Sequence, residues 1–234
     1  TTKEIMVCLI INGKTLPAQK ELVDALSVME GMKSISININ TKNTNVILGQ
    51  ESEVLFGRGY ITDTLSGIAF RISPLSFYQV NRNGAELLYK KAAEYVDPKE
   101  TDDILDLYCG AGTIGLSMAT KVKSIIGVEI IPEAIEDAKE NAKRNQITNA
   151  EFFCADAKDA AQKFAAEGKK FDVIIVDPPR KGCDQATLDA IEQMAPKRLV
   201  YVSCNPDTLA RDCKWFADKG YQIGEVTPVD LFPG

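Results

Sequence analysis

The sequence of 234 residues contains no histidine. This absence excludes a Ser-His-Asp triad, a Cys-His catalytic pair and metal sites built on imidazole ligands, and we expect no metal centre. Acid–base chemistry would fall to carboxylates, lysine, tyrosine, cysteine or the reactants themselves. The sequence also lacks a signal-peptide pattern and any apolar run near the ~18 residues of a membrane span, so no membrane attachment is expected.

Cysteine spacing and net charge narrow the class of protein further. The six cysteines include no C-x-x-C pair, so reduced thiols in a cytoplasmic protein are expected. A net charge of −6 argues against wholesale electrostatic binding of nucleic acid but leaves a local basic patch open. The chain begins with Thr rather than Met, which predicts a piece of a longer protein. No feature predicts an obligate protein partner.

The pattern of short apolar runs divides the chain into two parts. Residues 1–75 read as a small α+β module, in which one helix after Pro17 interrupts a series of strands rich in Val and Ile. Nothing in this module looks catalytic. The expected strands are Glu4–Ile11, Ser34–Asn40, Val46–Gly49, Val54–Ile61 and Ile68–Ile72.

Residues 76–234 show a regular alternation of strands and helices, after a linking helix at about Gly84–Val96. Continuous apolar strands that alternate with helices predict an α/β fold with a mostly parallel, doubly wound sheet. Ligands of such folds bind at the carboxyl ends of the strands. The expected strands are Asp103–Leu107, Ser124–Glu129, Glu151–Cys154, Phe171–Val176, Leu199–Ser203 and Gln222–Val226.

The end of the first of these strands carries a glycine-rich turn. Gly110, Gly112 and Gly115 satisfy G-x-G-x-x-G between a strand and a helix, and Glu129 ends the next strand. This spacing predicts a nucleotide-type cofactor, with the carboxylate accepting hydrogen bonds from ribose hydroxyls. A tight turn followed by a surface glutamate is the plainer alternative.

Acidic residues favour S-adenosylmethionine over NAD. Asp106 inside the strand and Tyr108 before the glycines resemble the first motif of class I methyltransferases, and a cationic sulfonium suits an acidic environment. Asp156, just past the third strand, is placed where those enzymes contact adenine. A helix N-cap is an equally good interpretation of Asp156.

Two further strand ends carry candidate catalytic residues. Two prolines after the fourth strand fix the backbone and hold Asp177 at the edge of the sheet. Cys204 follows the fifth strand, directly before a helix that begins at Pro206. A buried cysteine is the commoner case in general, but this position at the crevice, beside a helix N-terminus that favours thiolate, indicates a nucleophile.

Four ordered motifs together resemble the RNA uracil-C5 methyltransferase family, including its bacterial 23S rRNA members. The resemblance implies a class I methyltransferase domain, an RNA substrate (rRNA favoured over tRNA), S-adenosylmethionine as cofactor, and Cys204 as the nucleophile that adds to C6. It also implies cofactor contacts from Gln79, Tyr108, Gly110, Thr113, Glu129 and Asp177. The motifs are Ser76–Asn81, Tyr108–Gly110, Asp177–Gly182 and Ser203–Pro206.

The chain also departs from that family's pattern. The family's N-terminal RNA-binding barrel is missing, and the chain stops at Gly234, before the expected catalytic base and last strand. The first module and Arg82, Arg180, Lys181 and Arg211 are candidates for an RNA-facing surface. Three alternatives stay open: an RNA cytosine-C5 methyltransferase, which would carry a cysteine where Arg180 stands; an NAD-dependent oxidoreductase; and a non-catalytic RNA-binding fragment.

Overall fold

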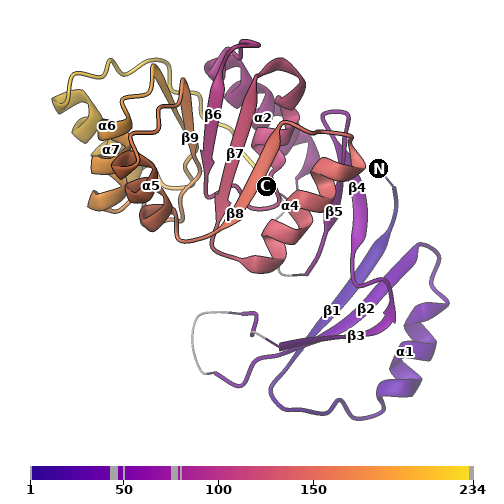
Figure 1. Cartoon of the computed structure of the whole chain (residues 1–234). Helices are drawn as coiled ribbons and strands as arrows, with labels where there is room; N and C mark the ends of the chain where they lie inside the picture. The colour runs from indigo at the N-terminus through magenta and orange to yellow at the C-terminus, as the bar shows by residue number, and fades with distance from the viewer. Residues whose placement is uncertain (1, 43–46, 50, 75–78, 80, 232–234) are drawn as a thin grey trace.

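The computed structural model describes residues 2–42, 47–49, 51–74, 79 and 81–231 (Figure 1). These residues form three sheets: a three-stranded sheet, a two-stranded hairpin and a five-stranded sheet surrounded by helices. No helix among them is both long and apolar enough to cross a membrane.

The three-stranded sheet forms the start of the chain. β1 (Ile5–Ile11) and β2 (Met32–Ile39) pair in parallel through the crossover helix α1 (Gln19–Ser27), and β3 (Glu51–Gly57) pairs antiparallel to β2. β2 is the central strand and is almost entirely buried. In Figure 1 this unit lies apart from the larger sheet.

A hairpin of β4 (Ile61–Leu65) and β5 (Ile68–Ile72) follows, and it packs on the larger part of the molecule. Leu65, Phe70 and Ile72 share one apolar core with Ile104 of the five-stranded sheet. The hydrophobic core therefore continues from the hairpin into the large sheet.

The open edge of β5 is hydrogen-bonded by a helix instead of a strand. Asp137, Asn141 and Asn145 lie four residues apart, and so on one face, of α4 (Pro132–Arg144) and its C-cap. Their side-chain oxygens accept the backbone N–H groups of Ser73, Arg71 and Ala69, respectively, at 2.6–3.1 Å. These contacts satisfy alternate N–H groups along the strand, as a neighbouring strand would.

The large sheet is parallel and has the order β10-β9-β6-β7-β8. Its central strands are short apolar runs buried on both faces, as the sequence predicted for a parallel sheet. The strands are β6 (Asp103–Leu107), β7 (Ser124–Glu129), β8 (Ala150–Cys154), β9 (Val173–Val176) and β10 (Arg198–Tyr201).

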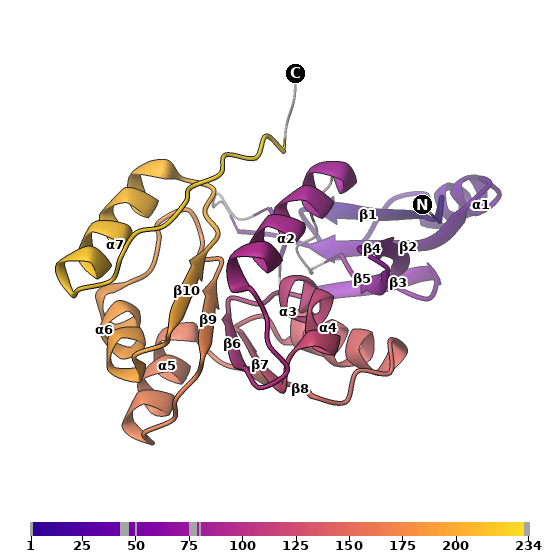
Figure 2. The same ribbon diagram turned by 90° about the horizontal axis from the view of Figure 1, so that it is seen from above.

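Helices cover both faces of this sheet, and a separate hydrophobic core lies between the sheet and the helices on each face. Consecutive residues such as Ile104 and Leu105 lie in opposite cores. α2 (Arg82–Val96), α3 (Thr113–Ser117) and α4 lie on one face, and α5 (Ala157–Ala166), α6 (Gln185–Met194) and α7 (Pro206–Asp218) lie on the other (Figure 2). A short 3₁₀ turn, η1 (Ala119–Lys121), follows α3.

Three predicted strands differ from the structure. Val54–Ile61 is interrupted at Arg58–Tyr60, where the chain turns from β3 into β4. Val46 lies outside the described residues, and residues 47–49 form no strand. Residues 222–226 pair with no strand among the described residues; this segment runs on past α2, where Thr227 contacts Tyr95 (Figure 2). An alternating apolar pattern makes a strand only where a partner edge is available.

Candidate active site

The predicted site residues lie along one edge of the large sheet. Because all five strands are parallel, their carboxyl ends meet at this edge. Across the sheet the order is Cys204 after β10, Asp177 after β9, Gly110 after β6, Glu129 at the end of β7 and Asp156 after β8. Neighbouring strands lie about 4.8 Å apart, so Cys204 and Glu129 are separated by roughly 14 Å along this edge.

The glycine-rich turn and Glu129 are joined directly. The N–H of Gly110 donates to Oε2 of Glu129 at 3.2 Å, and the N–H groups of Ile130 and Ile131 donate to Oε1 at 2.8 and 3.0 Å. Gly110 has a left-handed φ of 54°, and a Cβ there would meet no atom within 4 Å. The backbone at Gly110 therefore faces open space, where a ligand can approach.

One buried and one half-buried carboxyl group make this crevice acidic. Asp106 is 1% exposed; its Oδ2 accepts the N–H of Gly115 at 3.1 Å, while Oδ1 has no hydrogen-bond partner among the described residues. Burial, with the nearby charges of Asp177 and Glu129, raises the pKa of Asp106 to about 7. Burial also raises the pKa of Asp177 to about 6. A cation in the crevice would stabilise both carboxylates.

A tyrosine that sequence reasoning missed lies close to this acidic pair. The hydroxyl of Thr113, at the start of α3, donates to the Tyr89 hydroxyl at 3.2 Å. Burial raises the pKa of Tyr89 to about 12, and the charges of Asp177 and Asp106 add to the shift. Tyr89 lies on the buried face of α2 with Ala85 and Ala92. A hydroxyl within an otherwise apolar helical face was the available sequence signal.

Tyr108 and Asp156 have local roles in the structure. Tyr108 has a left-handed φ of 63° and packs against the core beneath α5 and α6. Burial, together with the neighbouring Cys183, raises its pKa. Asp156 caps α5, because its carboxylate accepts the N–H of Lys158 at 2.9 Å. The N-cap interpretation of Asp156 is thus confirmed, while contact with adenine stays a prediction.

Exposure separates Cys204 from Cys109 and Cys183, while Cys154, which ends β8 at the same edge, is exposed as well. Cys204 is exposed, and Asn205 caps the helix that follows it. Cys109 and Cys183 are buried, and burial raises both pKa values, that of Cys183 to about 12. Burial therefore disfavours the thiolate form of these two residues, and Cys204 as the nucleophile stays a prediction.

Comparison with known proteins identifies the family. The model of the tRNA (uracil-5-)-methyltransferase family matches residues 1–234. The chain belongs to this family. The family that the four motifs predicted is therefore confirmed.

Relatives and solved structures agree with this membership. The chain is 48% identical to an uncharacterized RNA methyltransferase of Halalkalibacterium halodurans, over 99% of this chain and 51% of that protein. It is 46% identical to an uncharacterized RNA methyltransferase of Caldanaerobacter subterraneus subsp. tengcongensis, over 99% of this chain and 52% of that protein. The chain thus spans about half the length of the curated relatives it matches.

A solved structure resembles the chain over nearly its whole length. It is the Pyrococcus abyssi tRNA (uracil-54, C5)-methyltransferase in complex with S-adenosyl-L-homocysteine, with a TM-score of 0.77 and 32% identity. The match covers 98% of this chain and 53% of that one. The predicted class I methyltransferase fold, preceded by a small strand-rich module, is confirmed.

The remaining predictions concern the loop before α2 and the basic residues. Gln79 is half-buried and lies two residues before Asn81, which is the N-cap of α2. Residues 75–78 and 80 lie outside the described part of the chain. Arg82 donates to the Thr64 carbonyl and pairs with Glu86. Contacts of Gln79 with a cofactor and of Arg82 with RNA stay predictions.

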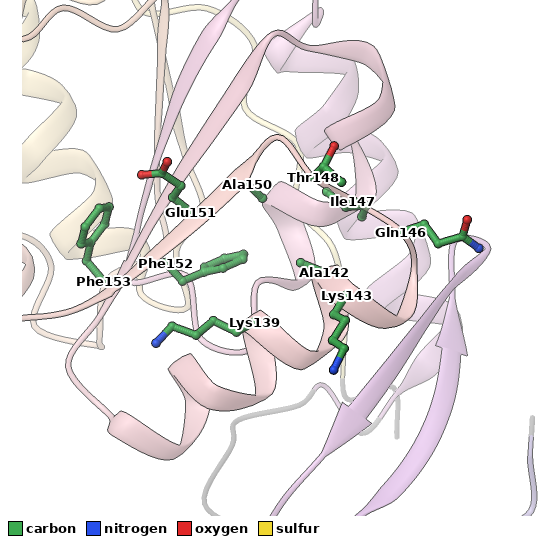
Figure 3. Close-up of a pocket in the computed structure, with 10 residues that line it drawn as sticks. All are labelled: Lys139, Ala142, Lys143, Gln146, Ile147, Thr148, Ala150, Glu151, Phe152 and Phe153. Atoms are coloured by element: carbon green, nitrogen blue, oxygen red, sulfur yellow. The ribbon is translucent and has the colours of Figure 1, made fainter.

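A surface concavity lies away from the strand ends. It has a volume of about 610 Å³ and lies between the end of α4 and the edge strand β8, where Lys139, Ile147, Phe152 and Phe153 line it (Figure 3). None of the predicted site residues lines it. The row of side chains at the strand ends, rather than this concavity, therefore marks the candidate active site.

Proposed function

We propose that the protein containing this chain methylates C5 of uracil in RNA with S-adenosylmethionine. The observation that carries the proposal is the order Cys204, Asp177, Gly110, Glu129 across adjacent strand ends. A nucleophile at one end and an acidic, glycine-lined crevice at the other suit a two-substrate reaction. Membership of the uracil-5 methyltransferase family supports the same reaction.

The residues at the strand ends suit the cofactor. Glu129 would hold the ribose, with Gly110, Tyr108 and Thr113 around it, and Gln79 and Asp156 would complete the site. Asp106, whose buried Oδ1 has no hydrogen-bond partner among the described residues, and Asp177 provide negative charge for the cationic ligand. When bound, S-adenosylmethionine supplies an electrophilic methyl group on a sulfonium.

Cys204 would make C5 reactive. Its thiolate adds to C6 of the uracil ring, which breaks the C5–C6 double bond and leaves electron density on C5 and O4. After C5 has gained the methyl group, loss of the C5 proton to a base restores the double bond and expels the thiolate. One covalent intermediate divides a difficult substitution into two easier steps. The target base must leave its helix to reach the sulfur, so a single-stranded or flipped nucleotide is expected.

The motif resemblance favours ribosomal over transfer RNA as the substrate. The solved Pyrococcus abyssi relative is a tRNA enzyme, so transfer RNA is the second candidate. Uracil is preferred to cytosine because Arg180, not a cysteine, follows Pro178-Pro179. A cytoplasmic location belongs to the same proposal, and the six free cysteines support it.

The covalent step provides the test. The intact protein, S-adenosylmethionine and a uridine-containing RNA stem-loop should give a protein–RNA adduct that denaturing electrophoresis detects. Cys204→Ser should abolish the adduct, whereas Cys109→Ser and Cys183→Ser should leave it largely unchanged. Mass spectrometry should find 5-methyluridine missing from the ribosomal RNA of a strain without the protein. An adduct that survives Cys204→Ser would refute the mechanism, and 5-methyluridine missing only from transfer RNA would refute the preference.

A further inference from the structure

We propose that Asp212, together with Arg211, is a positioning residue for the two loops that carry Asp177 and Cys204. Asp212 lies in α7, and its carboxylate accepts hydrogen bonds from Cys183, Tyr201 and Arg211 rather than from the loop residues Asp177 or Cys204. It acts by joining the loop 177–184, which follows β9, to the helix that follows Cys204. The inference rests on the proposed function, because the loops matter for catalysis only if Cys204 is the nucleophile.

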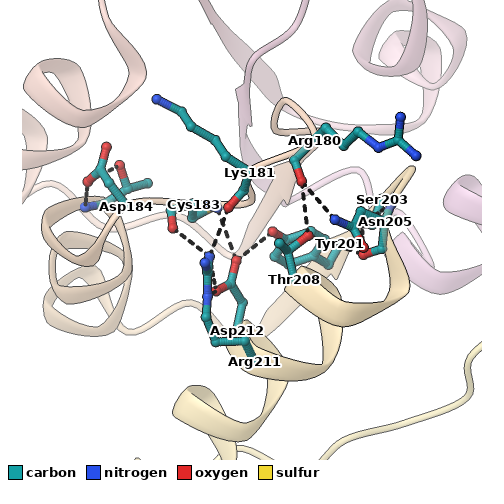
Figure 4. A network of polar contacts seen from close by, with 11 residues as sticks. Arg180, Lys181, Cys183, Asp184, Tyr201, Ser203, Asn205, Thr208, Arg211 and Asp212 are labelled. Atoms are coloured by element: carbon teal, nitrogen blue, oxygen red, sulfur yellow. Dashed lines mark hydrogen bonds and ion pairs between the residues drawn. The ribbon is translucent and has the colours of Figure 1, made fainter.

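Asp212 gathers donors from three separate segments (Figure 4). Its side chain is fully buried. Oδ2 accepts the N–H of Cys183 at 3.0 Å and the hydroxyl of Tyr201, the last residue of β10, at 2.7 Å. Oδ1 accepts Nε–H of Arg211 at 2.7 Å. A buried carboxylate is tolerated only when it is paired and hydrogen-bonded in this way, so each donor is held firmly in place.

Arg211 completes the connection to the same loop. Its guanidinium donates to the carbonyl oxygens of Lys181 and Cys183 at 3.2 and 3.0 Å. Four of its contacts thus point inward, to Asp212 and to the loop backbone. Sequence reasoning placed Arg211 on an RNA-facing surface. The Arg211 side chain is still 54% exposed, so its contact with RNA stays a prediction. Arg180 and Lys181 are also exposed, and their side chains extend away from this network (Figure 4).

Gly182 lets the loop approach this pair of side chains. It has a left-handed φ of 77°, and a Cβ there would lie 2.5 Å from Nη2 of Arg211 and 2.8 Å from Oδ2 of Asp212. A side chain at this position would displace either these two side chains or the loop. The glycine is therefore part of the same device.

A second set of contacts lies beside the nucleophile itself. The carbonyl oxygen of Arg180 accepts Nδ2–H of Asn205 at 3.2 Å and the hydroxyl of Thr208 at 3.4 Å. Asn205 directly follows Cys204, and Arg180 is three residues after Asp177. The loop is consequently fixed to α7 at two points, and a shift of the loop would move Cys204 relative to Asp177. Misplacement by about 1 Å can slow a reaction substantially while binding is kept.

The test compares Asp212→Asn with Asp218→Asn, a matched change at an exposed position of the same helix, where Asp218 pairs with Lys214. In the intact protein, three quantities are measured: hydrogen exchange at the Cys183 amide, the adduct-forming rate constant at saturating cofactor and RNA, and the cofactor dissociation constant. For Asp212→Asn we expect exchange at the Cys183 amide to be at least tenfold faster and adduct formation to be at least tenfold slower. The cofactor dissociation constant should change less than threefold. For Asp218→Asn we expect less than twofold changes.

Several outcomes would overturn the inference. A folded Asp212→Asn protein with a normal adduct rate would do so, as would equal losses of adduct rate and cofactor affinity, which indicate general loosening. If Asp212→Asn fails to fold, Arg211→Lys keeps the charge but not the guanidinium that bonds Asp212 through Nε and the two loop carbonyls through Nη2. A wild-type exchange rate at Cys183 in that variant would also overturn the inference. Absence of any adduct in the wild type would instead refute the proposed function, while the exchange measurement would still test the loop connection.

Discussion

At the scale of single residues, ionisation of the two carboxyl groups in the crevice has opposite effects on stability and on the binding of a cation. Asp106 and Asp177 keep their protons to pKa values of about 7 and about 6, against an ordinary value of 3.8. Their ionised forms destabilise the empty protein, because buried charge without a partner is costly. The same ionised forms favour a cation. A bound cation would therefore offset a cost in stability that these carboxylates impose without it.

The pH dependence of stability should reveal this cost. A raised carboxyl pKa means that the folded state binds more protons than the unfolded state between about pH 4 and 7, so the free energy of unfolding falls as pH rises. Without cofactor, we expect a loss on the order of 2–4 kcal/mol between pH 5 and 8. Asp106→Asn should remove most of this pH dependence, because an amide does not titrate. The variant should still fold, since the amide oxygen can accept the N–H of Gly115. Asp189→Asn, at an exposed position of α6, should leave it unchanged.

Urea unfolding at intervals of pH measures the effect. The carboxylates whose pKa is lowered, such as Asp103 beside Lys123 and Asp172 beside Lys197, add stability that is lost only as pH falls below about 4. They therefore leave the window from pH 5 to 8 unaffected. A free energy of unfolding that rises from pH 5 to pH 8 would contradict the assignment of Asp106.

At the scale of elements, the helix that replaces a strand beside β5 also reaches the glycine-rich turn. Asn141 is fully buried; its Oδ1 accepts the N–H of Arg71 at 2.6 Å, and its Nδ2 donates to the carbonyl oxygen of Ala111 at 3.1 Å. Ala111 stands between the first two glycines of the turn. One amide therefore connects the hairpin, α4 and the glycine-rich turn.

Removal of that amide should destabilise the protein. Asn141→Ala leaves the N–H of Arg71 and the carbonyl of Ala111 without these partners, at about 1–3 kcal/mol each. We expect the free energy of unfolding to fall by roughly 2–4 kcal/mol. Lys143→Ala, at an exposed position two residues further along α4, should change it by less than about 0.5 kcal/mol. Equal urea midpoints for the two variants would rule out this role of Asn141.

The same elements show what could be predicted from the sequence. Glu129 and Asp177 were found because apolar strands predict a parallel sheet, and a parallel sheet gathers its carboxyl ends at one edge. Asn141 and Asp212 were missed because polar residues on a helix ordinarily face solvent. Only the tertiary structure shows that β5 and the loop 177–184 supply their partners. The strand predicted for residues 222–226 was wrong because the local pattern is strand-like but no strand among the described residues pairs with it.

At the scale of the whole molecule, burial suggests two units of unequal stability. Met32, Ile35 and Ile37 of β2 are buried but belong to neither large core. The hydroxyls of Ser34 and Ser36, on the same strand, are buried without hydrogen-bond partners among the described residues. The helix α1 contains no buried residue. A unit of this size with so small a core is expected to be marginally stable.

The hairpin belongs to the other unit by the same criterion. Phe70 is 1% exposed and packs in the core that contains Ile104. Contacts between the units include those of the Glu4 carboxylate, which accepts the N–H of Thr62 at 2.6 Å and pairs with Arg58. We therefore place the boundary between cooperative units at residues 58–60. The pattern of apolar runs in the sequence had predicted it at residue 75.

Native-state hydrogen exchange of the intact protein can locate this boundary. Local opening exposes amides according to the stability of the unit that holds them, so amides of Ile35 and Ile37 should exchange roughly 100-fold faster than those of Leu105 and Ile174. The amide of Phe70 decides between the two boundaries. If the Phe70 amide exchanges at the slow rate of β6 and β9, the hairpin unfolds together with the methyltransferase core. This is the expected result, because the apolar side chains of the hairpin cannot leave that core unless the core itself opens. Exchange of Phe70 together with Ile35 would instead support a division at residue 75, and a single rate for all five amides would mean that the chain unfolds as one unit.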